Sequence, residues 1–267
     1  MPPDRYFCDA GDGTRLAYQA YGPEGAPAVM LVHAIGLDGS MWDAQRDALA
    51  TAYRVIVPDL RGHGASAVSD EPFGIADLAD DLHRVVTHSG VDAVRYVGCS
   101  MGANIGMFMA ARPEYGLSGV VLANGAARLA VPDDVVASLC AAARDGAMPM
   151  IAADMVARWV TPESATAPAT ARLVETLAAC SGNAFAAAFE ALARSDRTPD
   201  LGAIAVPALV LAGSADAAFD ATAAHAMAGA IPGATVVVVP DAGHLPNVER
   251  PDAFNHALLG FLAGLAS

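Results

Sequence analysis

The chain has 267 residues, 54% of them hydrophobic and 16% charged, so it can bury the core of one large α/β domain. Its formal net charge of −14 argues against nucleic acid and anionic membrane surfaces as partners. All fifteen basic residues are arginines. The lack of lysine excludes Schiff-base chemistry and a lysine-bearing phosphate loop.

Cysteine usage and the first residues bear on metal binding and on the compartment. The four cysteines form no C-x-x-C pair, so we expect neither a zinc site nor a dense disulfide framework. They are Cys8, Cys99, Cys140 and Cys180. The chain opens without an apolar signal region, and polar or turn residues interrupt each apolar run before it reaches membrane-spanning length. We expect a cytoplasmic protein without a metal site.

The predicted elements begin with a β-hairpin over 6–21, whose turn is Asp12-Gly13. Continuous apolar runs are typical of strands buried on both faces. Such strands are predicted at 28–32, 54–57, 119–123, 208–212 and 235–239, and another leads from Val94 into a glycine-flanked turn. Helices are predicted at 42–51, 75–89, 101–112, 221–230 and 252–265.

This alternation of strands and helices predicts a mostly parallel sheet with helices on both faces. It pauses over 130–199, an alanine-rich segment with helical spacing and no predicted strand. Turn residues divide this segment at Pro132, Pro149, Pro162, Pro168 and Gly182. We expect several short helices that form a lid over the sheet edge. The sequence thus predicts a core of 1–129 and 200–267 with a helical lid inserted at 130–199.

The turn after Val94 carries the first chemical signal. Gly98-Cys99-Ser100-Met101-Gly102 fits the G-x-S-x-G nucleophile elbow, in which a serine lies on a strained turn between a strand and a helix. Glycines on either side let neighbouring backbone approach without a Cβ clash. The helix that follows directs its N-terminal amides at the oxygen that gains charge. The five-residue pattern alone also occurs in surface turns. Assignment of Ser100 as a nucleophile therefore depends on a base and an orienting acid elsewhere in the chain.

Among seven histidines, His244 is the predicted base. It follows the last apolar strand, and loops at the carboxyl ends of parallel strands converge on one crevice. Four others lie within predicted helices and are expected at the surface: His83, His88, His225 and His256. The remaining two, His33 and His63, lie in loops that they are expected to fix by hydrogen bonding.

The acid that orients the base should follow the strand between Ser100 and His244. Asp216 lies in that loop, and its competitor Asp220 adjoins the next helix, where it suits an N-cap. The order Ser100, Asp216, His244 is the one expected of a hydrolase triad on this type of sheet. Two backbone amides are expected to form the oxyanion hole: that of Met101, and that of Ile35 in the loop after the 28–32 strand.

At these residues the chain resembles the α/β-hydrolase superfamily over almost its whole length. The stretches that carry the likeness are LVHAIG at 31–36, DLRGHGAS at 59–66, GCSMG at 98–102, GSAD at 213–216 and GH at 243–244. Within the superfamily the chain looks most like the 3-oxoadipate enol-lactonases. That likeness rests on MWD at 41–43, ANGAAR at 123–128, RW at 158–159 and GHLPNVERP at 243–251.

The resemblance implies hydrolysis of a small-molecule ester or lactone through an acyl-enzyme, with no metal or organic cofactor. It also has departures: HAIG stands at 33–36 where such lactonases tend to carry Asn-Ser-Leu-Gly, and Cys99 and Ala103 stand where Leu and Gly are frequent. Enol-lactones of this class carry a carboxylate, so Arg128 and Arg158 are candidates to bind it and Trp159 to wall the pocket. We expect Arg158→Ala to raise KM more for an anionic lactone than for a neutral ester.

Two alternatives stay open. The same triad serves perhydrolysis, C–C bond hydrolysis, and acyl transfer or cyclisation in natural-product biosynthesis, and the departures at Ala34 and Cys99 keep these reactions in view. A non-catalytic ligand-binding protein with this fold is a further alternative, because fold alone does not imply function. The sequence gives no prediction of the oligomeric state.

Overall fold

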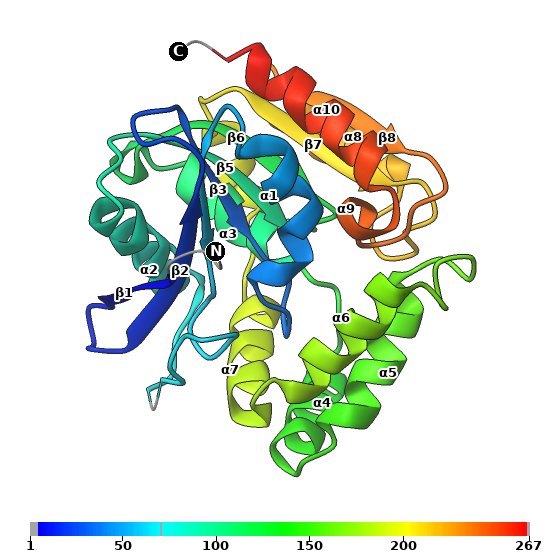
Figure 1. Ribbon diagram of the computed structural model, residues 1–267. Coiled ribbons are helices and arrows are strands. Elements are labelled where there is room, and N and C mark those ends of the chain that lie inside the picture. Colours follow the sequence, from blue (N-terminus) through cyan, green and yellow to red (C-terminus); the bar gives the residue numbers. More distant parts are fainter. Residues whose placement is uncertain (1–4, 70, 266–267) are drawn as a thin grey trace.

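In the computed structural model, residues 5–69 and 71–265 are described, and they form an eight-stranded sheet with helices packed around it (Figure 1). The strands lie in the order β1-β2-β4-β3-β5-β6-β7-β8. Their bounds are β1 (Arg5–Asp9), β2 (Arg15–Tyr21), β3 (Ala28–Val32), β4 (Arg54–Pro58), β5 (Val94–Cys99), β6 (Leu117–Ala123), β7 (Ala208–Gly213) and β8 (Thr235–Val239).

The sheet is parallel except for the N-terminal hairpin. β1 and β2 are antiparallel to each other, and β2 is antiparallel to β4. The strands from β4 across to β8 all run in one direction. β3, β5 and β7 are buried along their whole length, as expected of apolar strands covered on both faces. The expected mostly parallel α/β sheet is confirmed, and the carboxyl ends of its parallel strands share one edge.

Helices cover the sheet on two sides. α1 (Asp43–Leu49) contacts α10 (Pro251–Ala263) in front of the sheet as seen in Figure 1. α2 (Ile75–His88) packs against α3 (Met101–Ala110), which lies on β5 and β6, and α8 (Ala221–Ala230) packs on β7 and β8. The apolar residues of α2 recur at helical spacing and are buried: Ile75, Leu78, Ala79, Leu82, Val85 and Val86.

Between β6 and β7 the described chain is helical and contains no strand. This segment holds α4 (Asp133–Arg144), α5 (Met148–Trp159), α6 (Pro168–Ala179) and α7 (Gly182–Ala193). α4 packs on α7 and α5 on α6, and Figure 1 shows α4–α6 gathered at the lower right. An isolated bridge between Arg128 and Asp196 joins the two ends of the segment.

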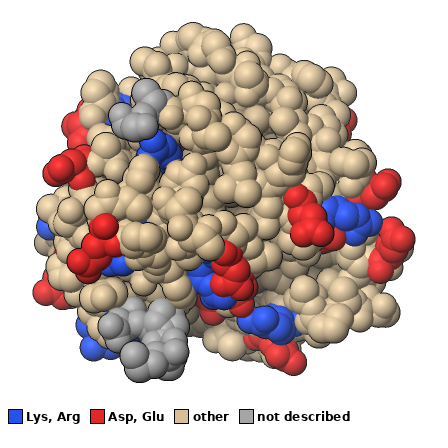
Figure 2. Space-filling view, turned by 45° about the horizontal axis from the view of Figure 1, so that its top comes forward, with Lys and Arg blue, Asp and Glu red and all other residues tan. Residues whose placement is uncertain are grey.

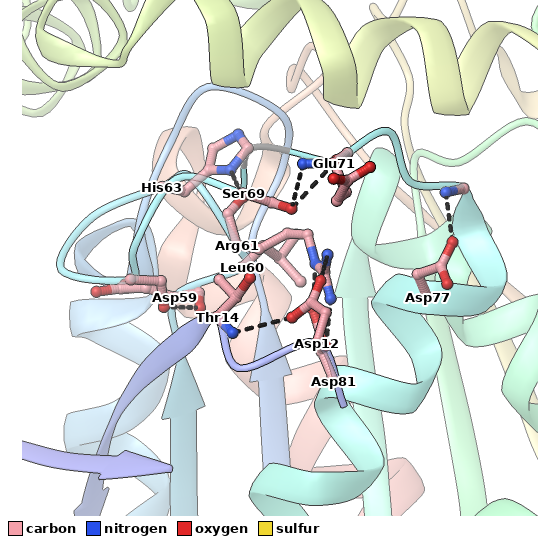
Figure 3. Close-up of polar contacts among 12 residues, drawn as sticks. Asp12, Thr14, Asp59, Leu60, Arg61, His63, Ser69, Glu71, Asp77 and Asp81 are labelled. Carbon is pink, nitrogen blue, oxygen red and sulfur yellow. Dashed lines mark hydrogen bonds and ion pairs between the residues drawn. The ribbon is translucent and has the colours of Figure 1, made fainter. Parts of the chain in front are cut away.

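The loop after β4 is fastened by a buried arginine, as Figure 3 shows. The guanidinium of Arg61 donates to both carboxylate oxygens of Asp81 on α2, at 2.6 and 2.7 Å, and to Asp12 of the hairpin turn at 2.8 Å. Two of these bonds form a bidentate pair, the geometry in which Arg and carboxylate match best. Arg61 therefore holds together three segments that are distant in sequence: its own loop, which also carries His63, the helix α2 and the hairpin turn.

Charges on the surface lie in mixed clusters. On the face in Figure 2, arginine side chains lie beside acidic ones. The ion pairs that link separate elements show the same pattern, for example Arg172 with Asp43 and Arg250 with Glu163. Among the described residues, no helix is both long enough and apolar enough to cross a membrane.

Candidate active site

The elbow at Ser100 has the backbone that its sequence predicts. Ser100 lies between β5 and α3 with φ 55° and ψ −113°, a conformation that costs a non-glycine residue about 1–3 kcal/mol. The flanking glycines make it possible. A Cβ at Gly98 would lie 2.3 Å from the carbonyl oxygen of Gly102, and a Cβ at Gly102 would lie 2.4 Å from that of Val32. The strain is therefore held by close backbone packing that only glycine permits.

The structure brings Ser100, His244 and Asp216 into hydrogen-bond contact. His244 Nε2 lies 3.0 Å from Ser100 Oγ, and His244 Nδ1 lies 2.7 Å from Asp216 Oδ2. Each residue follows the carboxyl end of a parallel strand, β5, β8 and β7 respectively. These distances are within the range that general-base activation of a serine requires. Asp220, the competing acid, instead caps α8 by accepting from the amide of Ala223 at 2.8 Å.

Asp216 is buried, and its carboxylate accepts several hydrogen bonds. Burial raises the pKa of Asp216, but the bond from His244, the charge of that ring, and bonds from Asn124 and the Ala218 amide outweigh it, so the pKa is lowered from its ordinary value. A carboxylate held in its charged form can orient His244 and stabilise the imidazolium that forms when the ring takes a proton.

Asn124 is a site residue that the sequence analysis did not single out for a role. It is fully buried at the end of β6, with φ 45°, and its Nδ2 donates to Asp216 Oδ2 at 2.6 Å. Its Oδ1 accepts from the amide of Gly213 at 3.3 Å. The available signal was position: Asn124 follows a parallel strand at the same sheet edge as the other three residues.

The loop after β3 is fixed by a buried histidine. His33 Nε2 accepts from the Leu60 amide at 2.9 Å, so Nδ1 carries the proton that is donated to the Ala34 carbonyl at 2.8 Å. Burial lowers the pKa of His33, which keeps the ring in this neutral form. Ile35 follows and lines the cavity beside Ser100. No described residue accepts a hydrogen bond from the amide of Ile35 or that of Met101.

A cavity of about 160 Å³ opens above Ser100 and His244. Three polar side chains reach it, those of Ser100, Asn124 and His244. The rest of its wall is apolar and consists of Ile35, Ala126, Leu129, Met155, Trp159, Phe189, Leu192, Ala218 and Phe219. The Trp159 ring lies 5.9 Å from the His244 ring, centroid to centroid, and tilted by 32°. The arrangement suits an uncharged group beside the serine.

The structure does not bring the two candidate arginines to this cavity. The side chain of Arg158 is 75% exposed and pairs with Asp154 one turn earlier on α5, at 2.6 Å. Arg128 is exposed at the base of the helical segment, where its backbone pairs with that of Asp196 in the isolated β-bridge. Trp159, the third candidate, is the one that reaches the wall.

Cys99 adjoins the nucleophile but faces away from the cavity. It is fully buried, and burial raises the pKa of its thiol, which keeps it protonated and unreactive. Within residues 5–69 and 71–265, no three His, Cys, Asp or Glu side chains are grouped so that they could hold a metal ion.

Comparison with known proteins identifies the family of the chain. The family model for the alpha/beta hydrolase fold matches residues 27–251. The chain is 32% identical to 3-oxoadipate enol-lactonase 2 of Acinetobacter baylyi, over 91% of each chain.

Solved structures give the same result. The enol-lactonase of Burkholderia xenovorans superposes with a TM-score of 0.92 and 32% identity, over 97% of this chain and 100% of that one. A thermophilic esterase of Thermogutta terrifontis gives 0.91 and 32%, over 97% and 98%. The chain belongs to the α/β-hydrolase family, and it is a hydrolase similar to enol-lactonases and esterases.

Proposed function

We propose that this hydrolase cleaves small carboxylic esters or lactones through Ser100, His244 and Asp216. The observation that carries the proposal is the chain of two hydrogen bonds, Oγ to Nε2 at 3.0 Å and Nδ1 to Oδ2 at 2.7 Å, which ends at an apolar cavity. His244 takes the proton of Ser100 while Oγ bonds to the carbonyl carbon. Asp216 holds the ring and stabilises its positive charge.

The remaining steps follow from the same groups. The amides of Ile35 and Met101 are proposed to donate to the oxyanion of the tetrahedral intermediate; neither has another acceptor among the described residues. His244 returns its proton to the leaving alcohol oxygen as the C–O bond breaks. In a lactone this oxygen stays attached to the acyl group. Water, deprotonated by His244, then attacks the acyl carbon, and His244 returns that proton to Ser100 Oγ as the bond between Oγ and the acyl group breaks and the acid is released.

Residues 130–199 are proposed to act as a lid on a core of 1–129 and 200–267. Several cavity-lining residues come from this segment, among them Met155 and Trp159 on α5 and Phe189 on α7. α6 and α7 also lie against the loop after β3, which carries Ile35, since a Cβ at Gly36 would lie 2.0 Å from Leu177 and 3.3 Å from Phe185.

The test is hydrolysis by the wild-type protein and Ser100→Ala of short p-nitrophenyl esters and neutral lactones. We expect turnover by the wild type and a loss of at least about 10⁴-fold in the variant, with an unchanged melting temperature. Turnover that survives in Ser100→Ala, or wild-type protein that binds these compounds without turning them over, contradicts the proposal.

3-Oxoadipate enol-lactone is the specific substrate candidate, favoured by the 32% identity to an enzyme of that name. The placement of Arg128 and Arg158 outside the cavity wall weighs against an anionic substrate. Comparing kcat/KM on freshly generated enol-lactone with that on a neutral lactone of the same ring size decides between them. A preference for the enol-lactone supports the specific candidate, and a preference for the neutral ring keeps the mechanism and rejects that substrate.

A further inference from the structure

One carboxylate lies between the loop of the candidate base and the end of helix α5. Glu249 is the last residue of α9 (Pro246–Glu249). Its Oε1 accepts from the amide of Gly243 at 2.8 Å. Its Oε2 accepts from the amide of Thr161 at 2.7 Å and from the Thr161 hydroxyl at 2.9 Å. A single side chain therefore bonds two segments that are more than eighty residues apart.

These two segments carry the candidate base and part of the cavity wall. Gly243 precedes His244, and Thr161 follows Trp159 by two residues. The segments also bond directly, since the His244 amide donates to the Trp159 carbonyl at 2.6 Å. They approach so closely that a Cβ at Gly243 would lie 2.4 Å from that carbonyl oxygen. A shift of either segment moves the other.

We propose that Glu249 is a positioning residue that sets His244 and the Trp159 wall of the cavity as one unit. This inference rests on the proposed function. An ionised carboxylate is acceptor-only, and here it meets three donors, two from Thr161 and one from Gly243. A glutamine of the same shape would turn its NH₂ group toward one of those donors. That end of the link would be lost, and both the base and the wall would lose a restraint.

A second link across the same junction provides a matched control. Arg250 pairs with Glu163 at 3.0 Å, and the Glu163 side chain is 80% exposed. Among the described residues, the Glu163 side chain has no hydrogen bond or ion pair to the His244 loop or to Trp159. Removing this charge changes the loop after α5 without changing the restraint on the site, so Glu163→Gln separates positioning of the site from general attachment of the helical segment.

The experiment measures kcat and KM on a p-nitrophenyl ester for the wild type, Glu249→Gln and Glu163→Gln. We expect Glu249→Gln to lose about tenfold in kcat/KM, through both a lower kcat and a higher KM, and Glu163→Gln to match the wild type. A role confined to overall stability would lower the melting temperature and leave both constants unchanged in the folded protein.

A double-mutant cycle with Trp159→Ala identifies the route of the effect. With the wall removed, Glu249→Gln should raise KM no further, while its effect on kcat should persist through His244. Equal increases in KM in both backgrounds overturn the inference. Thr161→Val, which removes only the hydroxyl donor and keeps the amide, should give a smaller rise in KM and replaces Glu249→Gln in the cycle if that variant does not fold.

Quenching of tryptophan fluorescence by acrylamide tests the inference without turnover. Trp42, the second tryptophan, is fully buried, so quenching reports on half-buried Trp159. Quenching should increase in Glu249→Gln and stay at the wild-type value in Glu163→Gln. Unchanged quenching in Glu249→Gln contradicts the inference whatever the substrate is, whereas absence of wild-type ester or lactone hydrolysis contradicts only the proposed function.

Discussion

The sheet edge that carries the candidate triad and the helical segment that walls the cavity are built in different ways. At the edge, the backbone ladder continues beyond the strands: the Ser100 amide donates to Ala123, the Asn124 amide to Leu211 and the Ser214 amide to Val239, each at 2.9 Å. Within the described residues, the helical segment is joined to the site by one backbone bond, from the His244 amide to the Trp159 carbonyl, and by side-chain bonds such as that of Glu249 with Thr161.

The difference separates chemistry from selectivity. Backbone bonds between neighbouring strands depend little on residue type, so the sheet edge keeps its geometry while side chains change. Contacts made by side chains change with each substitution. We therefore expect mutations at the sheet edge to affect the rate of reaction, and mutations in 130–199 to affect which substrate is bound.

His244→Ala should have the largest effect. Without a base, Ser100 keeps its proton, and kcat should fall by about 10⁴-fold or more, with KM little changed. Steady-state kinetics on a p-nitrophenyl ester measures this. The matched control is His256→Ala on α10, an exposed histidine outside the site, which should keep full activity. A residual kcat within tenfold of the wild type would exclude His244 as the base.

Lowering the pH should destabilise the folded protein through His63, which lies in the loop after β4. Burial, followed by the charge of nearby His33, lowers the pKa of His63 from 6.5 to about 4. Below pH 6.5 the unfolded chain therefore binds a proton at His63 that the folded protein does not bind. The free energy of unfolding falls as the pH falls toward 4. The loss from this group is about 3 kcal/mol.

Urea unfolding at pH 7 and pH 4.5 measures that loss. His63→Asn should show a smaller decrease, because an amide can still donate to the Arg61 carbonyl, as His63 Nδ1 does at 2.9 Å, and it does not titrate. The control His225→Asn, on an exposed position of α8, should follow the wild type. Identical pH dependence in all three proteins would contradict the assignment to His63.

Substitution of Asn124, at the same sheet edge, should have a smaller effect on kcat. Removing its amide leaves Asp216 with fewer donors, so the pKa of Asp216 should rise toward its ordinary value and kcat should fall about tenfold. Both Asn124→Gly and Asn124→Ala remove the bond, but only glycine accepts φ 45° without strain. Similar kcat losses in both variants assign the effect to the hydrogen bond; activity retained in Asn124→Gly assigns it to backbone strain.

The smallest effects should come from α5, where two neighbours differ in direction. Trp159→Ala opens the cavity wall and should raise KM about fivefold for an uncharged ester. Arg158→Ala should change KM less than about twofold for neutral and anionic substrates, since exposed ion pairs contribute little. A rise in KM confined to anionic lactones in Arg158→Ala would restore the sequence-based expectation that this arginine binds a carboxylate.

Much of the sheet was predictable because its signals are local. The helix expected at 221–230 and the strand at 235–239 have those bounds as α8 and β8. Errors of one or two residues arise at helix ends. α3 ends at Ala110 instead of 112, because Arg112 precedes Pro113 and is held in an extended conformation. The short α1 begins after a 3-10 turn, Gly39–Trp42, which the Asp38 side chain caps.

The site was predictable where strand order alone decides. The triad candidates were found from their places after three parallel strands, and their contacts agree with that reasoning. Asn124 and Glu249 were missed because no motif assigns them a role: each acts through side-chain contacts with residues 92 and 88 positions away, and the only signal for Asn124 was its place after β6. The arginines illustrate another limit. Adjacent helical residues point about 100° apart, and the sequence around 158–159 does not tell which of the two faces the cavity.

The long separation between Ser100 and His244 has a consequence for synthesis on the ribosome. The nucleophile and its elbow emerge about 144 residues before the base, and Glu249 follows later still. During that interval β3, β5 and β6 can pair and bury the elbow, while the end of α5 has neither the His244 amide nor Glu249 to hold it. On the proposed mechanism, hydrolase activity therefore arises only after the loop that carries His244 docks at the sheet edge, because a nascent chain that holds Ser100 alone lacks the base.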